Sequence, residues 1–173
     1  MKKYFALFLF LLSVALPDSQ ADEFSQNVDM SPWSDRVAVF TDGRVKSFET
    51  FARSYMPYIM GSKQYQSQDA TFTYFDMLIR PERYVGEDII FVKHKGLRAA
   101  IIAEVDITNP EVQSRMDTFM KRGLISREIL QQDAVRSLLN RLRQDVRRFA
   151  TPVEQIEGAI GASNPQVMWN NLK

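Results

Sequence analysis

The sequence predicts an α+β fold that is predominantly α-helical, with a small N-terminal β-hairpin accompanied by helices and a helical C-terminal half that contains one long amphipathic helix. Apolar residues recur at spacings of three and four over most of the chain, which is the period of an amphipathic helix. Strand-like alternation is confined to short runs, and one run surrounds an Asp-Gly pair, the strongest short signal for a hairpin. Neither a repeat nor a low-complexity tract interrupts these patterns.

The composition is that of a globular protein, with 45% apolar, 25% charged and 12% aromatic residues in a chain of 173. The chain carries 22 basic and 21 acidic residues. This near-neutral balance argues against a nucleic-acid partner, because such binding depends on neutralising phosphates. The chain has no cysteine, which excludes disulfide bonds, a thiol nucleophile, thiolate metal sites and covalent haem attachment through this chain.

Residues 1–21 have the pattern of a bacterial signal peptide. Lys2 and Lys3 precede an apolar run over residues 4–16, and Ser19 and Ala21 supply the small side chains that a signal peptidase recognises. The run is shorter than the roughly 20 residues that a membrane-spanning helix needs, so an uncleaved anchor is the weaker alternative. The sequence therefore predicts cleavage after Ala21 and a periplasmic location.

Residues 22–173 are expected to form a single soluble domain, because a chain of this length fits one hydrophobic core. Within this domain we expect a mixed α/β subregion over residues 33–105 and a helical subregion over residues 106–162. Nothing after the signal has the length and apolarity of a second membrane span. The polar residues 22–35 are expected to be an extended lead-in, with Trp33 packed against the body.

Local signals define most elements of the first half. Asp42 and Gly43, with alternating apolar residues on both sides, predict the hairpin. A helix is expected between a Ser47 cap and a Gly61 stop, and Pro57 should kink it or end it early. Further elements are expected as a helix over 70–79, a strand over 89–93, a helix passing into a loop over 97–107, and a helix over 110–122 that starts after Asn109 and stops at Gly123.

The second half is expected to be built around one long helix from Ser126 to Phe149. Its apolar stripe spans more than six turns, and the stripe predicts that Leu139 and Leu142 are buried. A capping box at residues 151–154 predicts another helix that ends near residues 158–161. The tail beyond it is expected to be irregular.

Residues of catalytic type are scarce. His94 is the single histidine and there is no G-x-S-x-G motif, so a surface or strand-end role is favoured over catalysis or haem ligation. The acidic residues Glu87 and Asp88, or Asp29 and Asp35, could serve a hydrolase, but solvated loop charges are the favoured interpretation, and calcium-loop spacing is absent. We therefore predict no enzyme activity, no cofactor and no metal site.

Two larger groups of residues each allow two interpretations. One is a group of C-terminal arginines that suits either a solvated helix face or an anionic partner: Arg136, Arg141, Arg143, Arg147 and Arg148. The other is a group of early aromatic residues that suits either ordinary core or the lining of a hydrophobic pocket: Phe48, Phe51, Tyr55, Tyr58, Phe72, Tyr74 and Phe75.

Residues 36–53 contain the most specific motif of the chain, the run G-R-V-K-S-F-E-T-F-A. This block resembles the periplasmic segment of bacterial system II-type cytochrome c biogenesis proteins, the haem-exporting, haem-ligating synthetases, in which G-R-x-K-P-[LF]-D-T-[FL]-A follows an extended strand. Ser47 replaces the proline of that pattern and Glu49 replaces the aspartate. The similarity covers residues 33–98, with shorter matches at 60–63, 77–82 and 90–93.

The resemblance implies a stand-alone, exported version of the extramembrane domain. The membrane part of that family, with its tryptophan-rich haem-handling segment and paired histidines, has no counterpart here. The chain is therefore expected to be a non-catalytic accessory protein that docks on a membrane cytochrome c assembly protein or its substrates. A free-standing periplasmic protein that binds a small ligand through the aromatic group is the alternative, and a hydrolase that uses acidic residues comes third.

The hairpin turn and the following helix start supply the candidate partner-binding residues, which are Gly43, Arg44, Lys46 and Arg53. Arg44 and Lys46 are two apart on a strand and are expected to project from one face, and Arg53 could join them from the helix. Such a positive patch suits an acidic loop or a haem propionate. The alternative is that Gly43 only closes a turn and that the charges are solvated.

Overall fold

The computed structural model describes residues 23–41 and 43–170, so the predicted signal peptide and Asp42 lie outside the described residues. Over the described residues the chain is mostly helical, and its strands form small antiparallel pairs, which confirms the predicted class. Within the same residues, no helix combines the length and the apolarity needed to cross a bilayer.

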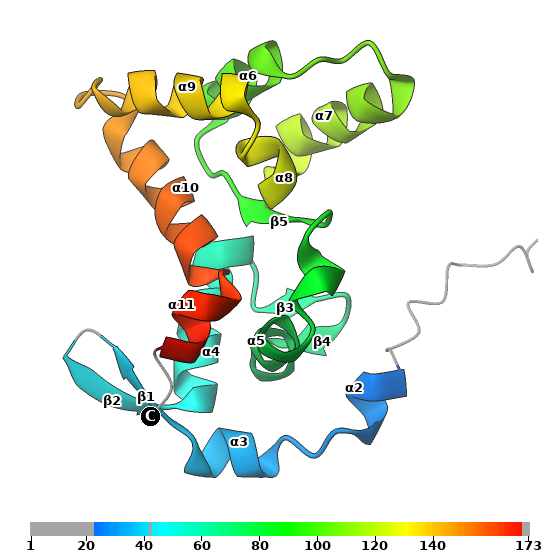
Figure 1. Cartoon of the computed structure of the whole chain (residues 1–173), viewed down its shortest axis with the longest axis vertical. Coiled ribbons are helices and arrows are strands. Elements are labelled where there is room, and N and C mark those ends of the chain that lie inside the picture. Colours follow the sequence, from blue (N-terminus) through cyan, green and yellow to red (C-terminus); the bar gives the residue numbers. More distant parts are fainter. Residues whose placement is uncertain (1–22, 42, 171–173) are drawn as a thin grey trace, which may run out of the picture.

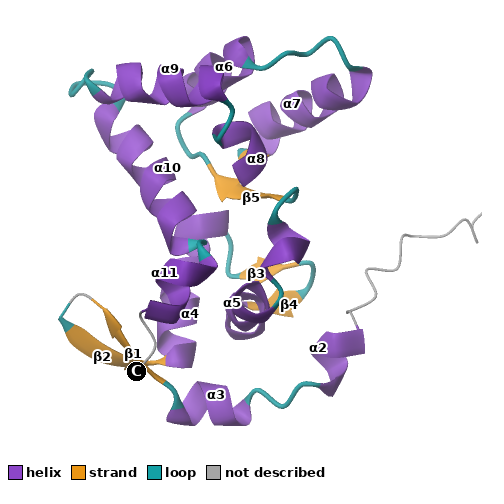
Figure 2. Ribbon diagram, in the orientation of Figure 1, coloured by secondary structure: helices purple, strands orange, loops and turns teal. Residues whose placement is uncertain are grey.

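The elements follow one another along the chain as Figures 1 and 2 show. The helices are α2 (Glu23–Asn27), α3 (Ser31–Arg36), α4 (Phe48–Met60), α5 (Ala70–Ile79), the 3₁₀ turn η1 (Pro81–Tyr84), α6 (Lys95–Glu104), α7 (Pro110–Arg122), α8 (Arg127–Leu130), α9 (Asp133–Arg143), α10 (Ala150–Ala162) and α11 (Pro165–Asn170). The strands are β1 (Ala38–Thr41), β2 (Arg44–Ser47), β3 (Gln64–Tyr65), β4 (Gln68–Asp69), β5 (Asp88–Phe91) and β6 (Leu124–Ser126), paired β1 with β2, β3 with β4 and β5 with β6.

The lead-in before the hairpin is not the loop that the sequence predicts, because it contains α2 and α3. The carboxylate of Asp29 accepts hydrogen bonds from the backbone amide and the hydroxyl of Ser31, which organises the start of α3. The expected packing of Trp33 is confirmed. Its ring lies 5.4 Å from that of Phe48 and 4.7 Å from that of Phe75, both edge-on.

Helix α4 begins and ends as its sequence signals indicate. The Ser47 hydroxyl accepts a hydrogen bond from the Thr50 amide, and Gly61 closes the helix with φ of +69°. Glycine is required at Gly61 for a second reason, because a β-carbon there would lie 2.6 Å from the ring of Phe91. The early end expected at Pro57 is wrong, since the helix runs on to its stop and the Pro57 carbonyl accepts the Gly61 amide.

Helices α5 and α7 have the bounds predicted for them. The carboxylate of Asp69 caps α5 and the side chain of Asn109 caps α7, while Gly123 ends α7 with φ of +82°. The predicted strand and the helix after it are present as β5 and α6. Pairing of β5 with β6 ties the first half of the chain to the second.

The long helix predicted from Ser126 to Phe149 is wrong. Ser126 belongs to β6, and its hydroxyl accepts the Ile129 amide to cap the short helix α8. Gln132 then adopts an extended conformation with ψ of 140°, which separates α8 from α9, and α9 ends at Arg143. The apolar stripe is therefore shared by two helices instead of forming one spine.

Burial along this stripe falls toward its end. Leu139 is 4% exposed, as predicted, whereas Leu142 is only partly buried against the core and Val146 is 80% exposed. The stripe stops packing where α9 stops. Leu142 therefore does not meet the prediction of full burial.

The last two helices also differ from expectation. Thr151 lies inside the first turn of α10, and Phe149 occupies the cap position with no side-chain cap bond, so the predicted capping box does not start the helix. The tail expected to be irregular contains α11, where the Asn164 side chain accepts the Gln166 amide at 3.0 Å. Residues 171–173 lie outside the described residues.

Helix α4 occupies the centre of the fold. It packs against α3, α5, α10 and β5, and one hydrophobic core includes residues from both halves of the chain. Figure 1 shows α10 and α11 descending beside α4 toward the hairpin, so the C-terminal helices lie next to the N-terminal motif. This contact brings α4, α10 and α11 together beside the hairpin.

Candidate functional site

The hairpin places Arg44 and Lys46 on one face, as expected from their spacing. In the antiparallel register, Arg44 lies opposite Thr41 and Lys46 opposite Val39. Val39 and Thr41 are buried, so this face of the hairpin is the one turned toward the body. Arg44 is exposed and Lys46 is partly buried.

The other two candidates are positioned differently. Arg53 lies one helical turn after Glu49 on α4 and binds its carboxylate at 2.8 Å, with both side chains substantially exposed. This local ion pair accounts for the Arg53 charge without a partner protein. Gly43 adopts φ of +71°, and a β-carbon there would meet nothing within 4 Å, so its role in the turn is conformational.

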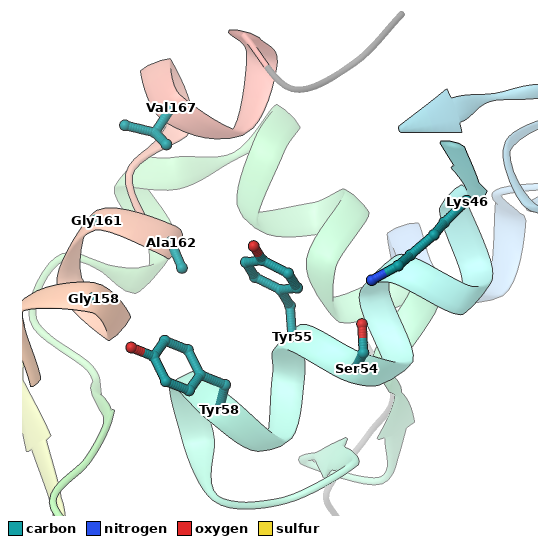
Figure 3. A pocket seen from close by; sticks show the side chains of 8 residues that line it. All are labelled: Lys46, Ser54, Tyr55, Tyr58, Gly158, Gly161, Ala162 and Val167. Atoms are coloured by element: carbon teal, nitrogen blue, oxygen red, sulfur yellow. The ribbon is translucent and has the colours of Figure 1, made fainter. Parts of the chain in front are cut away.

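A pocket lies between the hairpin, α4, α10 and α11, with a volume of about 580 Å³ (Figure 3). We call it the hairpin pocket. Its lining residues are Lys46 from β2, Ser54, Tyr55 and Tyr58 from α4, Gly158, Gly161 and Ala162 from α10, and Val167 from α11. The α4 residues share one helical face, and so do the α10 residues, because each set recurs at spacings of three or four.

Tyr55 forms a fixed wall of this pocket. Its ring lies 4.1 Å from the buried ring of Phe51, and its hydroxyl is 3.3 Å from the hydroxyl of Thr41 on β1. The Tyr58 ring follows at 6.5 Å from that of Tyr55, in an edge-on arrangement. The aromatic wall is therefore held in place by the core and by the hairpin.

The glycines of α10 make the opposite wall, and the two of them differ. A β-carbon at Gly158 would lie 2.0 Å from the Tyr58 hydroxyl, so this glycine makes room for the tyrosine. A β-carbon at Gly161 would meet nothing within 4 Å, so this position faces open space. Burial raises the pKa of Tyr58, and the neighbouring Tyr55 raises it further, so the Tyr58 hydroxyl is protonated at neutral pH.

The aromatic group divides between the two roles left open by the sequence. Tyr55 and Tyr58 line the pocket, whereas the other five members are buried in the core: Phe48, Phe51, Phe72, Tyr74 and Phe75. Sequence spacing could not separate them, because Tyr55 and Tyr58 follow the core residues Phe48 and Phe51 on the same helix. The α10 glycines suggested only the helix end, which the structure places just after them at Ala162, and their place in the pocket was missed.

Comparison with protein-family models, curated proteins and solved structures finds no match to this chain. The resemblance of residues 36–53 to cytochrome c biogenesis proteins therefore stays a prediction.

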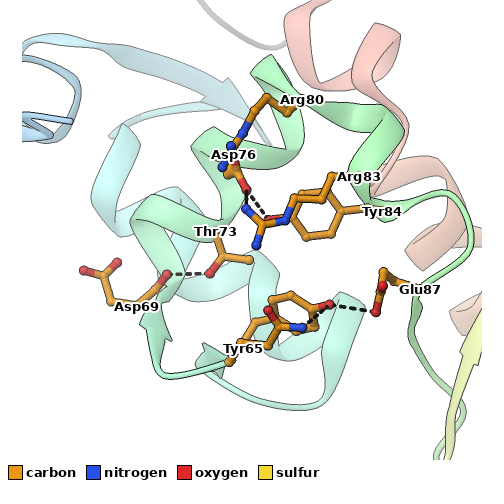
Figure 4. Close-up of polar contacts among 9 residues, drawn as sticks. Tyr65, Asp69, Thr73, Asp76, Arg80, Arg83, Tyr84 and Glu87 are labelled. Atoms are coloured by element: carbon orange, nitrogen blue, oxygen red, sulfur yellow. Dashed lines mark hydrogen bonds and ion pairs between the residues drawn. The ribbon is translucent and has the colours of Figure 1, made fainter. Parts of the chain in front are cut away.

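A second polar arrangement, the Asp76 cluster, consists of Asp76, Arg80, Arg83 and Tyr84 (Figure 4). The fully buried Asp76 carboxylate accepts hydrogen bonds from Arg80 Nε at 2.5 Å and from the Tyr84 hydroxyl at 2.6 Å. Arg83 contacts it at 3.4 Å. Burial raises the pKa of Tyr84 and the adjacent Asp76 carboxylate adds to this, so the phenol remains a donor. The cluster holds η1 against α5.

The acidic residues considered for hydrolysis are held by separate partners. Glu87 accepts from the Tyr65 hydroxyl at 3.1 Å, whereas Asp88 binds Arg115 at 2.7 Å. Asp29 is the residue that organises the start of α3. Within the described part of the chain, no three histidine, cysteine or acidic side chains are grouped as metal ligands.

His94 lies between β5 and α6 and caps that helix. Its Nδ1 accepts the Leu97 amide at 3.0 Å, and its ring packs edge-on against Phe149 at 5.4 Å. The Nδ1 atom of His94 is therefore occupied by the hydrogen bond that caps α6.

The C-terminal arginines are all exposed. Arg141 binds Glu104 at 3.3 Å and Arg143 forms an ion pair with Glu157. These contacts link α9 to α6 and to α10 and agree with a solvated helix face.

Proposed function

We propose that this chain is a non-catalytic periplasmic accessory protein of cytochrome c maturation, which docks on a membrane cytochrome c assembly protein through its hairpin. The observation that carries the proposal is that Arg44 and Lys46 lie along one face of a hairpin at the edge of the molecule, a face that turns toward the body at Lys46 and leaves Arg44 exposed near the turn. The motif that resembles the cytochrome c biogenesis family covers this hairpin, its cap and the first turns of α4. The motif thus coincides with one structural unit.

Charge supports a docking role for this unit. The chain carries almost equal numbers of basic and acidic residues, and the hairpin places two basic residues, Arg44 and Lys46, two positions apart on one strand. Complementary charge steers association and sets specificity more than it adds affinity. An acidic loop of a membrane partner, or a haem propionate presented by it, would meet Arg44 first because that side chain is the more exposed of the two.

The double variant Arg44→Ala/Lys46→Ala tests the proposal in cells that lack the chromosomal copy. The variant should accumulate normally, because Arg44 is exposed and Lys46 borders the hairpin pocket and not the hydrophobic core. Holocytochrome c should fall toward the level of the deletion strain. The matched control Arg141→Ala/Arg143→Ala removes two exposed arginines from α9 and should leave cytochrome levels normal. Normal levels in the hairpin variant, where deletion lowers them, contradict the proposal.

Export is part of the same proposal. Cleavage after Ala21 predicts that the protein isolated from the periplasm begins at Asp22. Mass spectrometry of the exported protein tests this, and retention of Met1 contradicts cleavage.

The second candidate function is a periplasmic protein that binds a small ligand, and the hairpin pocket is the observation that favours it. Its volume of about 580 Å³ falls in the range of small-molecule sites, roughly 300–1,000 Å³. Native mass spectrometry of the purified protein tests this candidate. A stoichiometric small molecule supports it, and a mass equal to that of the bare chain at every purification stage counts against it.

A further inference from the structure

A second pocket, which we call the α9 pocket, lies between the end of α8, one face of α9 and α10, with a volume of about 620 Å³. Its lining residues are Leu130 from α8, Gln131 from the link between α8 and α9, Arg136, Leu139 and Asn140 from α9, and Glu157 and Ile160 from α10. The α9 residues share one helical face, because they recur at spacings of three and four. None of these residues lines the hairpin pocket, so the two pockets are separate.

Arg136 supplies an uncompensated positive charge to the α9 pocket. Among the described residues, no hydrogen bond, ion pair or ring contact engages its guanidinium, whereas Arg141 and Arg143 on the same helix are each bound by a glutamate. Glu157 is the other charged residue of the described lining, and Arg143 neutralises it in an ion pair. The charge that remains for a ligand to neutralise is therefore that of Arg136.

The rest of the lining combines amide groups with an apolar floor. The side-chain amides of Gln131 and Asn140 have no hydrogen-bond partner within the described part of the chain, and each can donate through its N–H groups. Leu130 is 1% exposed and Leu139 is 4% exposed, and Ile160 packs partly buried against the same core. A molecule in this pocket therefore meets a guanidinium, amide donors and an apolar floor.

We propose that the α9 pocket binds a small carboxylate that carries one negative charge and an apolar body. Its carboxylate lies on Arg136 and Asn140, and its body lies over the floor of Leu130, Leu139 and Ile160. The planar guanidinium matches a carboxylate with two parallel N–H donors, and this charge-assisted contact is stronger than one between neutral groups. Asn140 lies one helical turn after Arg136, beside the same carboxylate. This inference goes beyond both candidate functions, because it concerns a different pocket.

The charges and the floor select this class of ligand over its neighbours. A cationic ligand would be repelled by Arg136. A dicarboxylate would carry its second charge onto the apolar floor, where losing water is costly, or toward the carboxylate of Glu157. A neutral apolar molecule leaves the guanidinium without a counter-charge. The volume of about 620 Å³ lies within the range of small-molecule sites, roughly 300–1,000 Å³.

Four six-carbon probes test the charge preference on the purified protein, in titrations followed by amide NMR. They are hexanoate, hexan-1-ol, hexylamine and adipate. We expect saturable binding of hexanoate, about tenfold tighter than that of hexan-1-ol, with adipate and hexylamine weaker than hexanoate. Equal affinities for hexanoate and hexan-1-ol, or no saturable shift with hexanoate, overturn the proposal. The shifting amides should centre on α9 and α10 around Asn140 and Ile160, and a response centred on Tyr55 and Tyr58 of the hairpin pocket also overturns it.

Three variants of exposed residues locate the carboxylate. Arg136→Met should abolish the preference for hexanoate and leave the affinity for hexan-1-ol unchanged. Arg147→Met removes the same charge from an exposed arginine outside the lining, and this matched control should behave as the wild type. Asn140→Asp places a negative charge beside Arg136 at almost unchanged volume, so it should weaken hexanoate and spare hexan-1-ol. A carboxylate preference that survives Arg136→Met or Asn140→Asp overturns the proposal.

Discussion

The Asp76 cluster and the hairpin pocket both combine charged and aromatic side chains, yet they are built in opposite ways. Asp76 is fully buried, and its partners Arg80, Arg83 and Tyr84 follow within eight residues of the same chain segment. The hairpin pocket is open, and its lining comes from four elements spread between Lys46 and Val167. Figure 3 shows the hairpin pocket and Figure 4 shows the Asp76 cluster.

The difference separates charges that are enclosed in the fold from a charge that lies beside an open pocket. The Asp76 carboxylate is bound from several sides by local donors, so its removal leaves the buried Tyr84 hydroxyl without its acceptor. Arg98 is the cationic counterpart, because its guanidinium donates to the carbonyls of Val92, Lys93, Met120 and Lys121 and joins β5 to the end of α7. Lys46 instead borders a space of about 580 Å³.

The largest effect is expected for Asp76→Ala. Removing one partner of a buried ion pair costs about 3–5 kcal/mol, and here the buried Tyr84 hydroxyl also loses its acceptor. Denaturant unfolding monitored by circular dichroism should show this loss. The control Glu49→Ala breaks the exposed pair with Arg53 and should cost less than about 1 kcal/mol. Equal unfolding free energies for the two variants would contradict the view that the Asp76 cluster stabilises the fold more than an exposed ion pair does.

The next largest loss of unfolding free energy is expected for Leu139→Ala on α9. Leu139 is 4% exposed, and truncation of a buried leucine costs about 2–5 kcal/mol, whereas Leu142→Ala should cost clearly less because Leu142 is only partly buried. The same denaturation measurement gives both values. A larger loss for Leu142 than for Leu139 would mean that α9 packs through a different face.

Gly123→Ala and Gly43→Ala isolate the role of Arg98. Both glycines have positive φ, which costs a residue with a β-carbon about 1–2 kcal/mol. A β-carbon at Gly123 would also lie 2.3 Å from Arg98 Nη2, whereas one at Gly43 meets nothing. Gly123→Ala should therefore lower the unfolding free energy by more than Gly43→Ala. Equal losses would show that Arg98 moves aside freely.

The smallest effects distinguish the glycines of α10. Gly161→Ala should stabilise the protein by about 0.5–1 kcal/mol, because alanine favours the helix and its methyl group enters open space. Gly158→Ala should destabilise it despite the same propensity gain, because its β-carbon would meet the Tyr58 hydroxyl. Thermal melts of the two variants should shift in opposite directions. A destabilised Gly161→Ala protein would mean that the pocket is closed in solution.

Elements with strong local signals were predictable from the sequence. Asn109, Pro110 and Gly123 mark both ends of α7, and the Asp-Gly pair marks the hairpin, because caps and positive φ depend on single residues. The break between α8 and α9 carries no such mark. The two glutamines at residues 131–132 suit a helix as well as a turn, so the apolar stripe on both sides suggested continuity.

The sequence predicted the shared face of Arg44 and Lys46 but not the pocket beside them. The spacing of Arg44 and Lys46 fixes their shared face, since a strand alternates its side chains. The pocket beside them depends on α10 crossing α4, a tertiary contact between segments about 100 residues apart. Gly158 and Gly161 matter only through that contact, and their local pattern suggested a helix end.

Docking through the hairpin is tested most directly by co-purification from detergent-solubilised membranes. The tagged wild-type protein and the Arg44→Ala/Lys46→Ala variant would be expressed at equal levels, and the retained membrane proteins identified and quantified by mass spectrometry. A multi-span cytochrome c assembly protein should be retained by the wild type and by Arg141→Ala/Arg143→Ala, and lost with the hairpin variant. Equal retention by all three proteins, or no cytochrome assembly protein with the wild type, would contradict the proposed role.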